Sequence, residues 1–447
     1  MKDSIAVVGT GLVGSLFSVY MAKRGFRVDA FDRRPDIRKM KVVQGRSINL
    51  ALSERGWRGL MEAGLEKEIR RVALPMKGRM MHSRKGELTF QPYGKEGQAI
   101  YSVSRGLLNQ ELLHAADVHK DVNLHFNHRC LDIDPDTNRI TFFDETGNEE
   151  VEVTADRIFG ADGAYSAVRQ RMQRMDRFNF SQEYLTHGYK ELEIPATTDG
   201  SHRMQNDCLH IWPRDEYMLI ALPNPDGSFT CTLFMAYEGK ESFERIKTEK
   251  DVMDFFERNF ADTIPLMPTL VEDFLQNPTP SLVMTKCEPW NIEDRICLIG
   301  DAAHAIVPFY GQGMNAGFED CRIFNDLMNE HGDDFGVVIP TFAAQRKPAA
   351  DAILELALRN YIEMRDKTAD KEFLLQKKIE ARFSAKYPDK WMPLYSQVSF
   401  THIPYNEALA NGDRQEAIMQ KIMQRPDIER TWDSEEVEKE WLSLLNN

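Results

Sequence analysis

Apolar and polar positions at the start of the chain follow the order strand, helix, strand. Residues 5–8 form an apolar run, residues 12–24 have the apolar spacing of a helix, and residues 27–31 form a second apolar run. Two such runs joined by a helical segment predict a βαβ unit with parallel strands. The chain therefore begins in the manner of an α/β fold.

Later segments alternate between the two patterns. Residues 76–97 alternate apolar and polar positions, which predicts strands of a second sheet, whereas the leucines after Ser104 have helical spacing. Strand-like runs with turn residues between them occupy 122–158 and 186–281, the latter with a helical run near 250–274. From 344 onward the pattern is helical and charged, except at 393–404. Ser53, Glu54 and Arg55 resemble the start of a capped helix.

Gly9, Gly11 and Gly14 lie between the first predicted strand and the first predicted helix. Their spacing is that of the dinucleotide fingerprint, which needs a tight turn, a close approach of backbone to pyrophosphate, and close packing of helix on strand. Asp32, at the end of the second strand, has the position of a carboxylate that binds a ribose hydroxyl. The alternative is that Asp32 is only a loop-start or capping carboxylate.

A second glycine-rich stretch follows an apolar run at 296–299. Gly300 and Asp301 end this predicted strand, and Gly311 and Gly313 open a predicted helix. A helix that starts on small residues presents free N–H groups and a positive dipole end to an anion. Reduced flavin carries negative charge at N1 and O2, so this helix suits the flavin edge, with Asp301 near the ribityl hydroxyls. The alternative is an ordinary strand, loop and helix with turn glycines.

A third stretch, residues 155–170, places Asp162 and Gly163 after a strand-like segment, with Ser166 and Arg169 at fixed offsets. Taken in their order along the chain (residues 9–14, 155–170 and 296–313), the three stretches resemble the signatures of single-component FAD-dependent aromatic hydroxylases. The resemblance implies a Rossmann-like FAD-binding domain with GxGxxG, DG and GD signatures, interleaved with a mixed-sheet substrate domain and followed by a C-terminal helical region. Residues 1–75, 98–185 and 282–365 are then assigned to the FAD-binding domain, 76–97 and 186–281 to the substrate domain, and 366–447 to the helical region.

Shorter segments narrow the resemblance. RSINLALSERG (46–56), QPYG (91–94), HGYKEL (187–192), LHIWPR (209–214) and NYIEMRD (360–366) resemble the kynurenine 3-monooxygenase family. This resemblance implies hydroxylation of L-kynurenine to 3-hydroxy-L-kynurenine in tryptophan degradation, which leads to pyridine nucleotides. It also implies bound FAD, NADPH as a transient co-substrate, and O2. A flavin C4a-hydroperoxide would transfer oxygen to an already electron-rich ring, so no side-chain base is expected.

Site residues follow from the positions that match the family. The residues implied to bind FAD are Gly9, Gly11, Leu12, Val13, Gly14, Asp32, Arg33, Ala51, Arg105, Leu131, Asp162, Asp301, Gly313, Met314 and Asn315. The residues implied to bind substrate are Arg79, Tyr93, Phe234, Pro308, Phe309, Asn360 and Tyr395. Arg79 is the expected partner of the substrate carboxylate, because a guanidinium binds a carboxylate through two parallel hydrogen bonds. Residue types alone leave open that these side chains are solvated charges or ordinary packing.

The composition restricts partners and location. A net charge of −14 argues against a nucleic-acid binder, and six scattered cysteines predict buried free thiols in a reducing compartment. No apolar run approaches about 18 residues and the first strand follows Met1 closely, so we expect neither a membrane span nor a signal peptide. A cytoplasmic location is predicted. The histidine spacing predicts no metal site, and no second glycine fingerprint exists for NADPH.

Alternatives to this function come from three classes. A related FAD-dependent hydroxylase would act on another anthranilate-like or phenolic acid. The same fold also serves as a non-catalytic carrier of lipidated proteins that lacks the flavin site, and the intact glycine and aspartate signatures argue against that reading. A plain nicotinamide dehydrogenase would give the second and third stretches no purpose. The sequence leaves open whether the protein is a monomer or a homodimer, and what Tyr310 does in the pocket.

Overall fold

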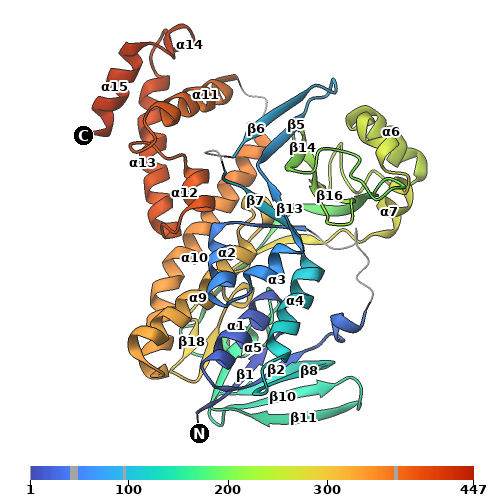
Figure 1. Ribbon diagram of the computed structural model, residues 1–447, viewed down its shortest axis with the longest axis vertical. Coiled ribbons are helices and arrows are strands. Elements are labelled where there is room, and N and C mark those ends of the chain that lie inside the picture. The colour runs from blue at the N-terminus through green and yellow to red at the C-terminus, as the bar shows by residue number, and fades with distance from the viewer. Residues whose placement is uncertain (1, 41–48, 94–96, 367–370, 447) are drawn as a thin grey trace.

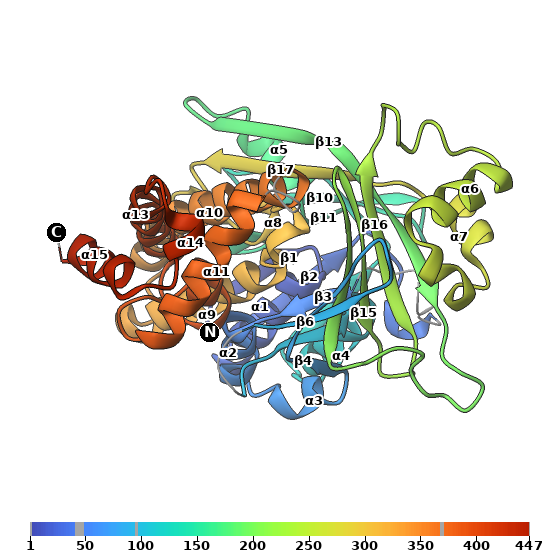
Figure 2. The same ribbon diagram turned by 90° about the horizontal axis from the view of Figure 1, so that it is seen from above.

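A computed structural model describes residues 2–40, 49–93, 97–366 and 371–446 of the chain. The N-terminal sheet lies at one end of an elongated body, and the helices α11 to α15 lie at the other. A second large sheet lies beside these helices, to their right in both views (Figures 1 and 2). The helices are α1 Leu12–Lys23, α2 Glu54–Glu62, α3 Glu66–Arg70, α4 Arg105–Asp117, α5 Ala167–Met172, α6 Glu249–Asn259, α7 Leu270–Gln276, α8 Asp301–His304, α9 Gly313–His331, α10 Phe335–Asp366, α11 Lys371–Lys386, α12 Leu394–Phe400, α13 Tyr405–Met423, α14 Ile428–Thr431 and α15 Glu435–Leu445. Short 3₁₀ helices are η1 Ile37–Lys39, η2 Ala261–Leu266 and η3 Pro308–Tyr310.

The first sheet has six strands in the order β18-β19-β12-β1-β2-β8. Its strands are β1 Ser4–Val8, β2 Arg27–Asp32, β8 Val122–Phe126, β12 Arg157–Gly160, β18 Asn291–Ile292 and β19 Ile296–Leu298. All its pairs are parallel except β18 with β19. The predicted βαβ unit is thus confirmed as β1, α1 and β2, and its apolar runs are buried because structure covers both faces of a parallel sheet.

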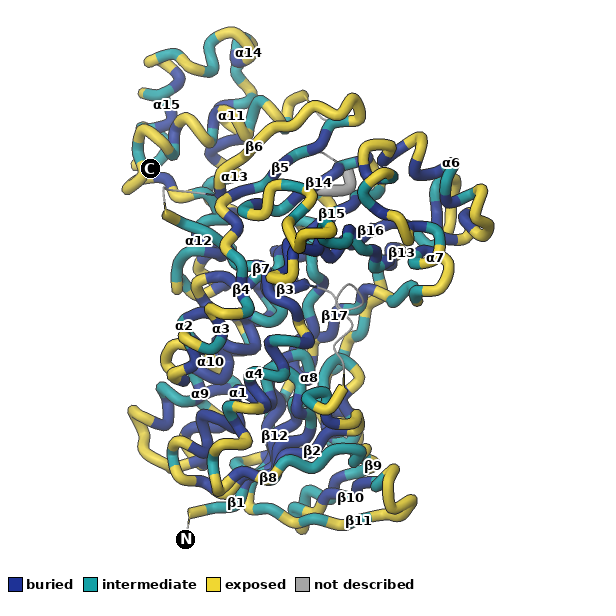
Figure 3. The backbone as a smooth tube through the Cα atoms, turned by 45° about the vertical axis from the view of Figure 1, so that its right-hand side comes forward, coloured by how far each residue is buried: buried dark blue, intermediate teal, exposed yellow. Residues whose placement is uncertain are grey.

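Helices and a small antiparallel sheet cover this six-stranded sheet. Helix α1 packs on α4 and α9, while strand β9 contacts β2. The small sheet has the order β11-β10-β9, with β9 His128–Asp134, β10 Arg139–Asp144 and β11 Glu149–Thr154. Phe17, Phe159 and Phe324 pack ring to ring in the core, with centroids 4.4 to 5.3 Å apart. The dark-blue interior in Figure 3 follows this core through the lower half of the molecule.

The second large sheet has seven strands in the order β17-β13-β16-β15-β14-β5-β6. Its strands are β5 Gly78–His82, β6 Leu88–Pro92, β13 Asn179–Ile194, β14 Cys208–Arg214, β15 Tyr217–Pro223, β16 Phe229–Ala236 and β17 Ser281–Glu288. Only β14 with β5 is a parallel pair, so the sheet is mixed as predicted. A smaller sheet, β3-β7-β4, links the two large ones, with β3 Asn49–Leu52, β4 Ala73–Met76 and β7 Ile100–Ser104.

The domain limits drawn from the sequence at 185 and 282 fall within strands. Strand β13 pairs with β17 from Asn179 onward, and β17 continues to Glu288. The seven-stranded sheet therefore includes residues 179–185 and 282–288, which lie outside the predicted limits. A hydrophobic pattern locates such strands but carries no information on which sheet they join.

The C-terminal region corrects one expectation. Residues 393–404, excepted from the helical pattern, contain helix α12, which begins after Pro393 and ends at Phe400. Its sequence, with an aromatic residue at each end and Val398 between them, has little local helix preference, so packing against α13 and α2 determines its conformation. Beyond it, Phe383, Trp391 and Trp441 form a separate small core.

Two expectations from composition can be compared with the fold. All six cysteines are free, and all but the half-buried Cys130 are buried. In the described ranges, no helix combines the length and the apolar character needed to cross a bilayer.

Candidate active site

A cavity of about 2370 Å³ lies between the six-stranded and seven-stranded sheets and reaches the C-terminal helices. Its walls come from the glycine-rich turn after β1, from β5 and β6, from η3 and from α12. The cavity is therefore built from segments of the chain that are far apart in sequence.

The glycine-rich turn forms one wall of the cavity. Gly9 has a φ of +102°, and a Cβ there would lie 2.5 Å from the carbonyl oxygen of Ala161. A Cβ at Gly14 would lie 1.9 Å from the carbonyl oxygen of Gly9, so helix and strand can pack this closely only without a side chain. A Cβ at Gly11 would meet nothing within 4 Å, because Gly11 faces the cavity. The open space beside Gly11 and the uncapped start of α1 fit a pyrophosphate.

Asp32 lies at the rim of this wall and is well bonded. Its carboxylate accepts hydrogen bonds from Thr10 (backbone N 3.0 Å, Oγ1 3.1 Å) and from Arg34 (Nε and Nη2, each 3.0 Å). Burial opposes ionisation, but the Arg34 guanidinium and these donors hold the pKa of Asp32 below its usual value. Asp32 thus has the turn-stabilising role that was the alternative, and it also faces the cavity as a ribose partner would.

Two half-buried aspartates, Asp162 and Asp301, line the cavity. Asp162 accepts from the backbone N–H of Ala167 at 2.7 Å through one oxygen, while its Oδ1 is buried without a partner among the described residues. Asp301 begins helix α8 after Gly300, whose φ is +62°. Burial raises the pKa of both carboxyl groups. A bound group with hydroxyls could donate hydrogen bonds to these carboxyl oxygens, as the sugar part of a dinucleotide does.

The start of helix α9 forms a further wall. Its N-cap residue, Gln312, makes no side-chain capping bond, so the first N–H groups near Gly313 and Met314 are free to meet an anionic edge. Asn315 fixes this helix start. Its Oδ1 accepts from the Ser53 N–H at 2.9 Å, and its Nδ2 donates to the carbonyl oxygens of Ala51 (2.8 Å) and Gly311 (2.7 Å).

Arg79 lies against two tyrosine rings at the substrate end of the cavity. Its Cζ is 4.6 Å from the ring centroid of Tyr395 and 5.1 Å from that of Tyr93. Tyr395 stacks on Tyr93 (centroids 5.6 Å) and on Tyr310 (5.7 Å). Burial raises the pKa of the Tyr93 hydroxyl, which therefore stays neutral. One guanidinium held between ring faces suits a carboxylate ligand with an organic body.

An apolar wall continues from this cluster. Phe234 on β16 packs against Phe309, with centroids 5.1 Å apart, and Pro308 precedes Phe309 in η3. Asn360 on α10 donates from Nδ2 to the carbonyl oxygen of Phe309 at 2.7 Å, so it supports this wall. An aromatic ring bound between Arg79 and Phe234 would be screened from water on this side.

Most residues predicted for the site line the cavity. These are Gly9, Gly11, Leu12, Val13, Asp32, Arg33, Ala51, Arg79, Tyr93, Arg105, Asp162, Phe234, Asp301, Pro308, Phe309, Gly313, Met314, Asn360 and Tyr395. Gly14 and Asn315 do not line it but support residues that do. Leu131 does not line it either. Its side chain is 38% exposed, and the preceding residue, Cys130, lines the wall instead.

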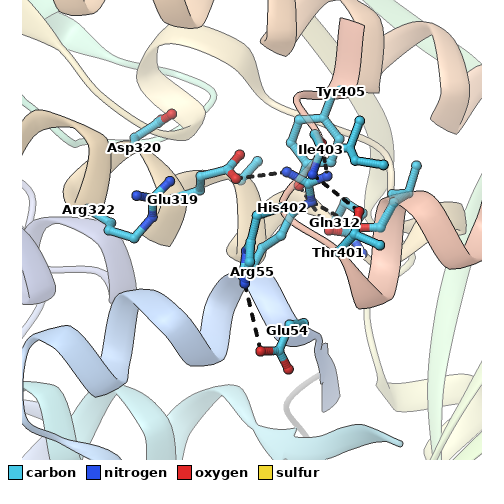
Figure 4. A network of polar contacts seen from close by, with 12 residues as sticks. Glu54, Arg55, Gln312, Glu319, Asp320, Arg322, Thr401, His402, Ile403 and Tyr405 are labelled. Atoms are coloured by element: carbon cyan, nitrogen blue, oxygen red, sulfur yellow. Dashed lines mark hydrogen bonds and ion pairs between the residues drawn. The ribbon is translucent and has the colours of Figure 1, made fainter. Parts of the chain in front are cut away.

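Three interpretations of single residues can also be compared with the structure. The predicted helix start is confirmed, because Ser53 is the N-cap residue of α2 and Glu54 opens its first turn, but the Ser53 hydroxyl makes no capping bond. Arg55 is fully buried in an ion pair with Glu319 (Figure 4). His304 is buried, bonded to Asp320 at 2.6 Å and stacked on Trp290. Sequence reasoning missed the role of Tyr310, whose only signal was its place beside the GQG motif.

The whole chain is similar to proteins of known family. The chain matches the FAD binding domain family over residues 2–357. Kynurenine 3-monooxygenase of Flavobacterium johnsoniae is 52% identical over 441 residues, which cover 99% of this chain and 98% of that protein. The Sus scrofa protein of the same name is 44% identical over 422 residues, which cover 94% and 88%.

Solved structures share the fold. The tetrameric form of 2-methyl-3-hydroxypyridine-5-carboxylic acid oxygenase has a TM-score of 0.67 at 20% identity, over 82% of this chain and 94% of that one. P. aeruginosa PqsL in complex with 2-aminobenzoylacetate has a TM-score of 0.66 at 17% identity, over 81% and 97%. At these identities the likeness establishes the fold alone. Together with the sequence matches, it confirms the fold class predicted above, and the chain belongs to the FAD binding domain family and, within it, to the kynurenine 3-monooxygenase family.

Proposed function

We propose that this chain hydroxylates L-kynurenine to 3-hydroxy-L-kynurenine with bound FAD, NADPH and O2. Relatives named for that activity match it at 52% and 44% identity over nearly the whole chain. The observation that best supports the substrate is Arg79, a guanidinium that lies against two tyrosine rings in a cavity whose opposite wall has the dinucleotide glycine turn.

The FAD-binding part of the proposal assigns each wall a role. The turn at Gly9 and Gly11 approaches the pyrophosphate, Asp32 faces a ribose, and Asp162 and Asp301 accept hydroxyl hydrogen bonds. The free N–H groups at the start of α9 face the anionic edge of the ring system. Bound FAD would supply the chemistry of oxygen activation and transfer, which no side chain provides.

The substrate part uses the other end of the cavity. Arg79 binds the α-carboxylate of L-kynurenine, and the tyrosines around it shield that ion pair from water. Phe234, Pro308 and Phe309 hold the aromatic ring in a fixed plane. The ring carbon that is oxidised lies ortho to an amino group and is already electron-rich, so the residues need only orient it and exclude water.

Other features stay predictions from the sequence. These are the cytoplasmic location, the choice between monomer and homodimer, and the domain limits. NADPH would bind transiently, since the chain has one glycine fingerprint.

The test measures NADPH oxidation by the purified yellow protein with and without L-kynurenine, together with the products. We expect strong stimulation and formation of 3-hydroxykynurenine. Stimulation that yields only hydrogen peroxide would mean that L-kynurenine is an effector and that another anthranilate-like or phenolic acid is the substrate. A protein purified without flavin would contradict the whole assignment.

A further inference from the structure

Arg55 is the centre of a buried contact between the start of the chain and its C-terminal segment. It lies on α2 with a side chain that is 0% exposed. Its Nη1 donates to Glu319 Oε1 on α9 at 2.8 Å, its Nε donates to the carbonyl oxygen of Val398 at 2.9 Å, and its Nη2 donates to that of Ile403. Figure 4 shows the guanidinium between Glu319 and residues 401–405.

The two carbonyl groups that accept from Arg55 lie at and just beyond the C-terminal end of α12. Val398 belongs to the last turn of α12, where helix carbonyl groups lack partners within the helix and the dipole is negative. A cation that donates to this turn acts as a C-terminal cap. The ring of Tyr405, at the start of α13, packs against the Arg55 guanidinium, with its centroid 4.1 Å from the Arg55 Cζ.

Helix α12 needs such a cap because it is short. It has seven residues, from Leu394 to Phe400, and a helix of that length is not stable by itself. It also carries Tyr395, whose ring lies between those of Tyr93 and Tyr310 beside the Arg79 guanidinium. The position of that ring therefore depends on what holds the helix end.

We propose that Arg55 is a positioning residue for the substrate site: it caps α12 and so fixes Tyr395 over Arg79. The effect on L-kynurenine binding rests on the proposed function, whereas the capping of α12 by Arg55 does not depend on it. Glu319 orients Arg55 in turn, since its second oxygen accepts from Arg346 Nη1 at 3.0 Å. The carboxylate is thus held between two arginines.

The direct variant is Arg55→Lys. Lysine keeps the charge beside Glu319 but cannot donate in three fixed directions or stack flat on Tyr405. The matched control is Arg58→Met, one turn further along α2. The Arg58 side chain is 41% exposed, and among the described residues it forms its hydrogen bond and ion pair with Glu62. We expect Arg55→Lys to retain FAD and to raise the Kd for L-kynurenine, followed by flavin absorbance, at least tenfold, and Arg58→Met to leave it unchanged.

Two further measurements separate positioning from general damage. Hydrogen exchange of the 394–403 amides should become at least tenfold faster in Arg55→Lys and stay native in Arg58→Met, since capping protects that helix. In a Tyr395→Ala background, Arg55→Lys should raise the Kd for L-kynurenine less than twofold, because both substitutions affect binding through the ring of Tyr395. If Arg55→Lys loses its flavin, Tyr405→Leu removes the ring beneath the guanidinium, and the same measurements apply to it.

Each outcome has one meaning. Native exchange at 394–403 overturns the inference whatever L-kynurenine does. A tenfold loss of binding that persists in the Tyr395→Ala background overturns it too, since Arg55 would then act by another route. A native protein that ignores L-kynurenine counts against the proposed function alone, and the exchange rates then decide on Arg55.

Discussion

Replacing Arg79 by methionine tests the substrate assignment most directly. The change removes a guanidinium whose Cζ is 4.6 Å and 5.1 Å from two tyrosine ring centroids, and leaves an aliphatic chain of similar length. A charge-assisted hydrogen bond contributes about 1.5–3 kcal/mol, and a bound carboxylate would lose two of them. We expect a loss of about 3–5 kcal/mol in transition-state binding, or about two to four orders of magnitude in kcat/KM for L-kynurenine. Arg79→Lys keeps a point charge and should lose about 5- to 30-fold.

The assay compares L-kynurenine with kynuramine, its analogue without the carboxylate. If Arg79 binds that group, Arg79→Met lowers kcat/KM for L-kynurenine to the level of kynuramine and changes kynuramine itself less than fivefold. The control is Arg84→Met, which removes an exposed arginine two residues beyond β5 that is paired with Asp215 at 2.9 Å, and should change neither substrate. Equal losses on both substrates in Arg79→Met would refute the reasoning, because the arginine would then only support the tyrosine rings.

Further predictions concern cofactor binding and stability. Gly11→Ala should fold normally and lose affinity for FAD in a flavin titration, since its Cβ enters the cavity. Gly14→Ala should lower the melting temperature, since its Cβ lies 1.9 Å from the carbonyl oxygen of Gly9. A lower melting temperature in Gly11→Ala together with native stability in Gly14→Ala would contradict this account of the turn. Burial lowers the pKa of His210 from 6.5 to about 4, so on acidification the unfolded chain takes up this proton before the folded protein does. The contribution of the neutral ring to the free energy of unfolding is therefore complete above pH 6.5 and is lost as the pH falls toward 4. The native protein should therefore lose about 2 kcal/mol more than His210→Gln between pH 7 and pH 5, read from urea midpoints, and parallel curves would exclude the effect. Glu319→Gln should cost about 3–5 kcal/mol of stability in the same assay because two buried arginines lose a carboxylate, and Glu62→Gln on the exposed Arg58 pair should cost under about 1 kcal/mol.

The sequence predicts those parts of the site whose geometry is local. Gly9, Gly11 and Gly14 lie within six residues, and their spacing alone determines the turn, the helix start and the approach to the cavity. The same is true of Asp301 and of the helix that opens at Gly313, both of which line the cavity where the pattern placed them. Here a short motif contains all the atoms that its structure needs.

Contacts between distant segments could not be predicted in this way. The sequence identified Arg55 only as part of a helix start, because no neighbouring residue indicates that its partners are Glu319, Val398 and Ile403. Helix α12 was missed for the same reason, since its conformation depends on packing and capping by other elements. Leu131, assigned by its position in a family, is 38% exposed and does not line the cavity, so its role in FAD binding stays a prediction.

The buried charges explain how the distant segments meet in one arrangement. Arg55 and Arg346 share Glu319, and Arg346 also donates to Asp320, which accepts from His304 and from the Gly300 N–H at 3.1 Å. Apolar residues of the same volume would give comparable stability in many registers, because hydrophobic contact has no direction. Guanidinium groups donate along fixed axes, so α2, α9, α10 and residues 398–403 satisfy them in one relative position. Since that network reaches the Gly300 turn at one end and α12 at the other, the same set of bonds sets both the FAD wall and the ring of Tyr395.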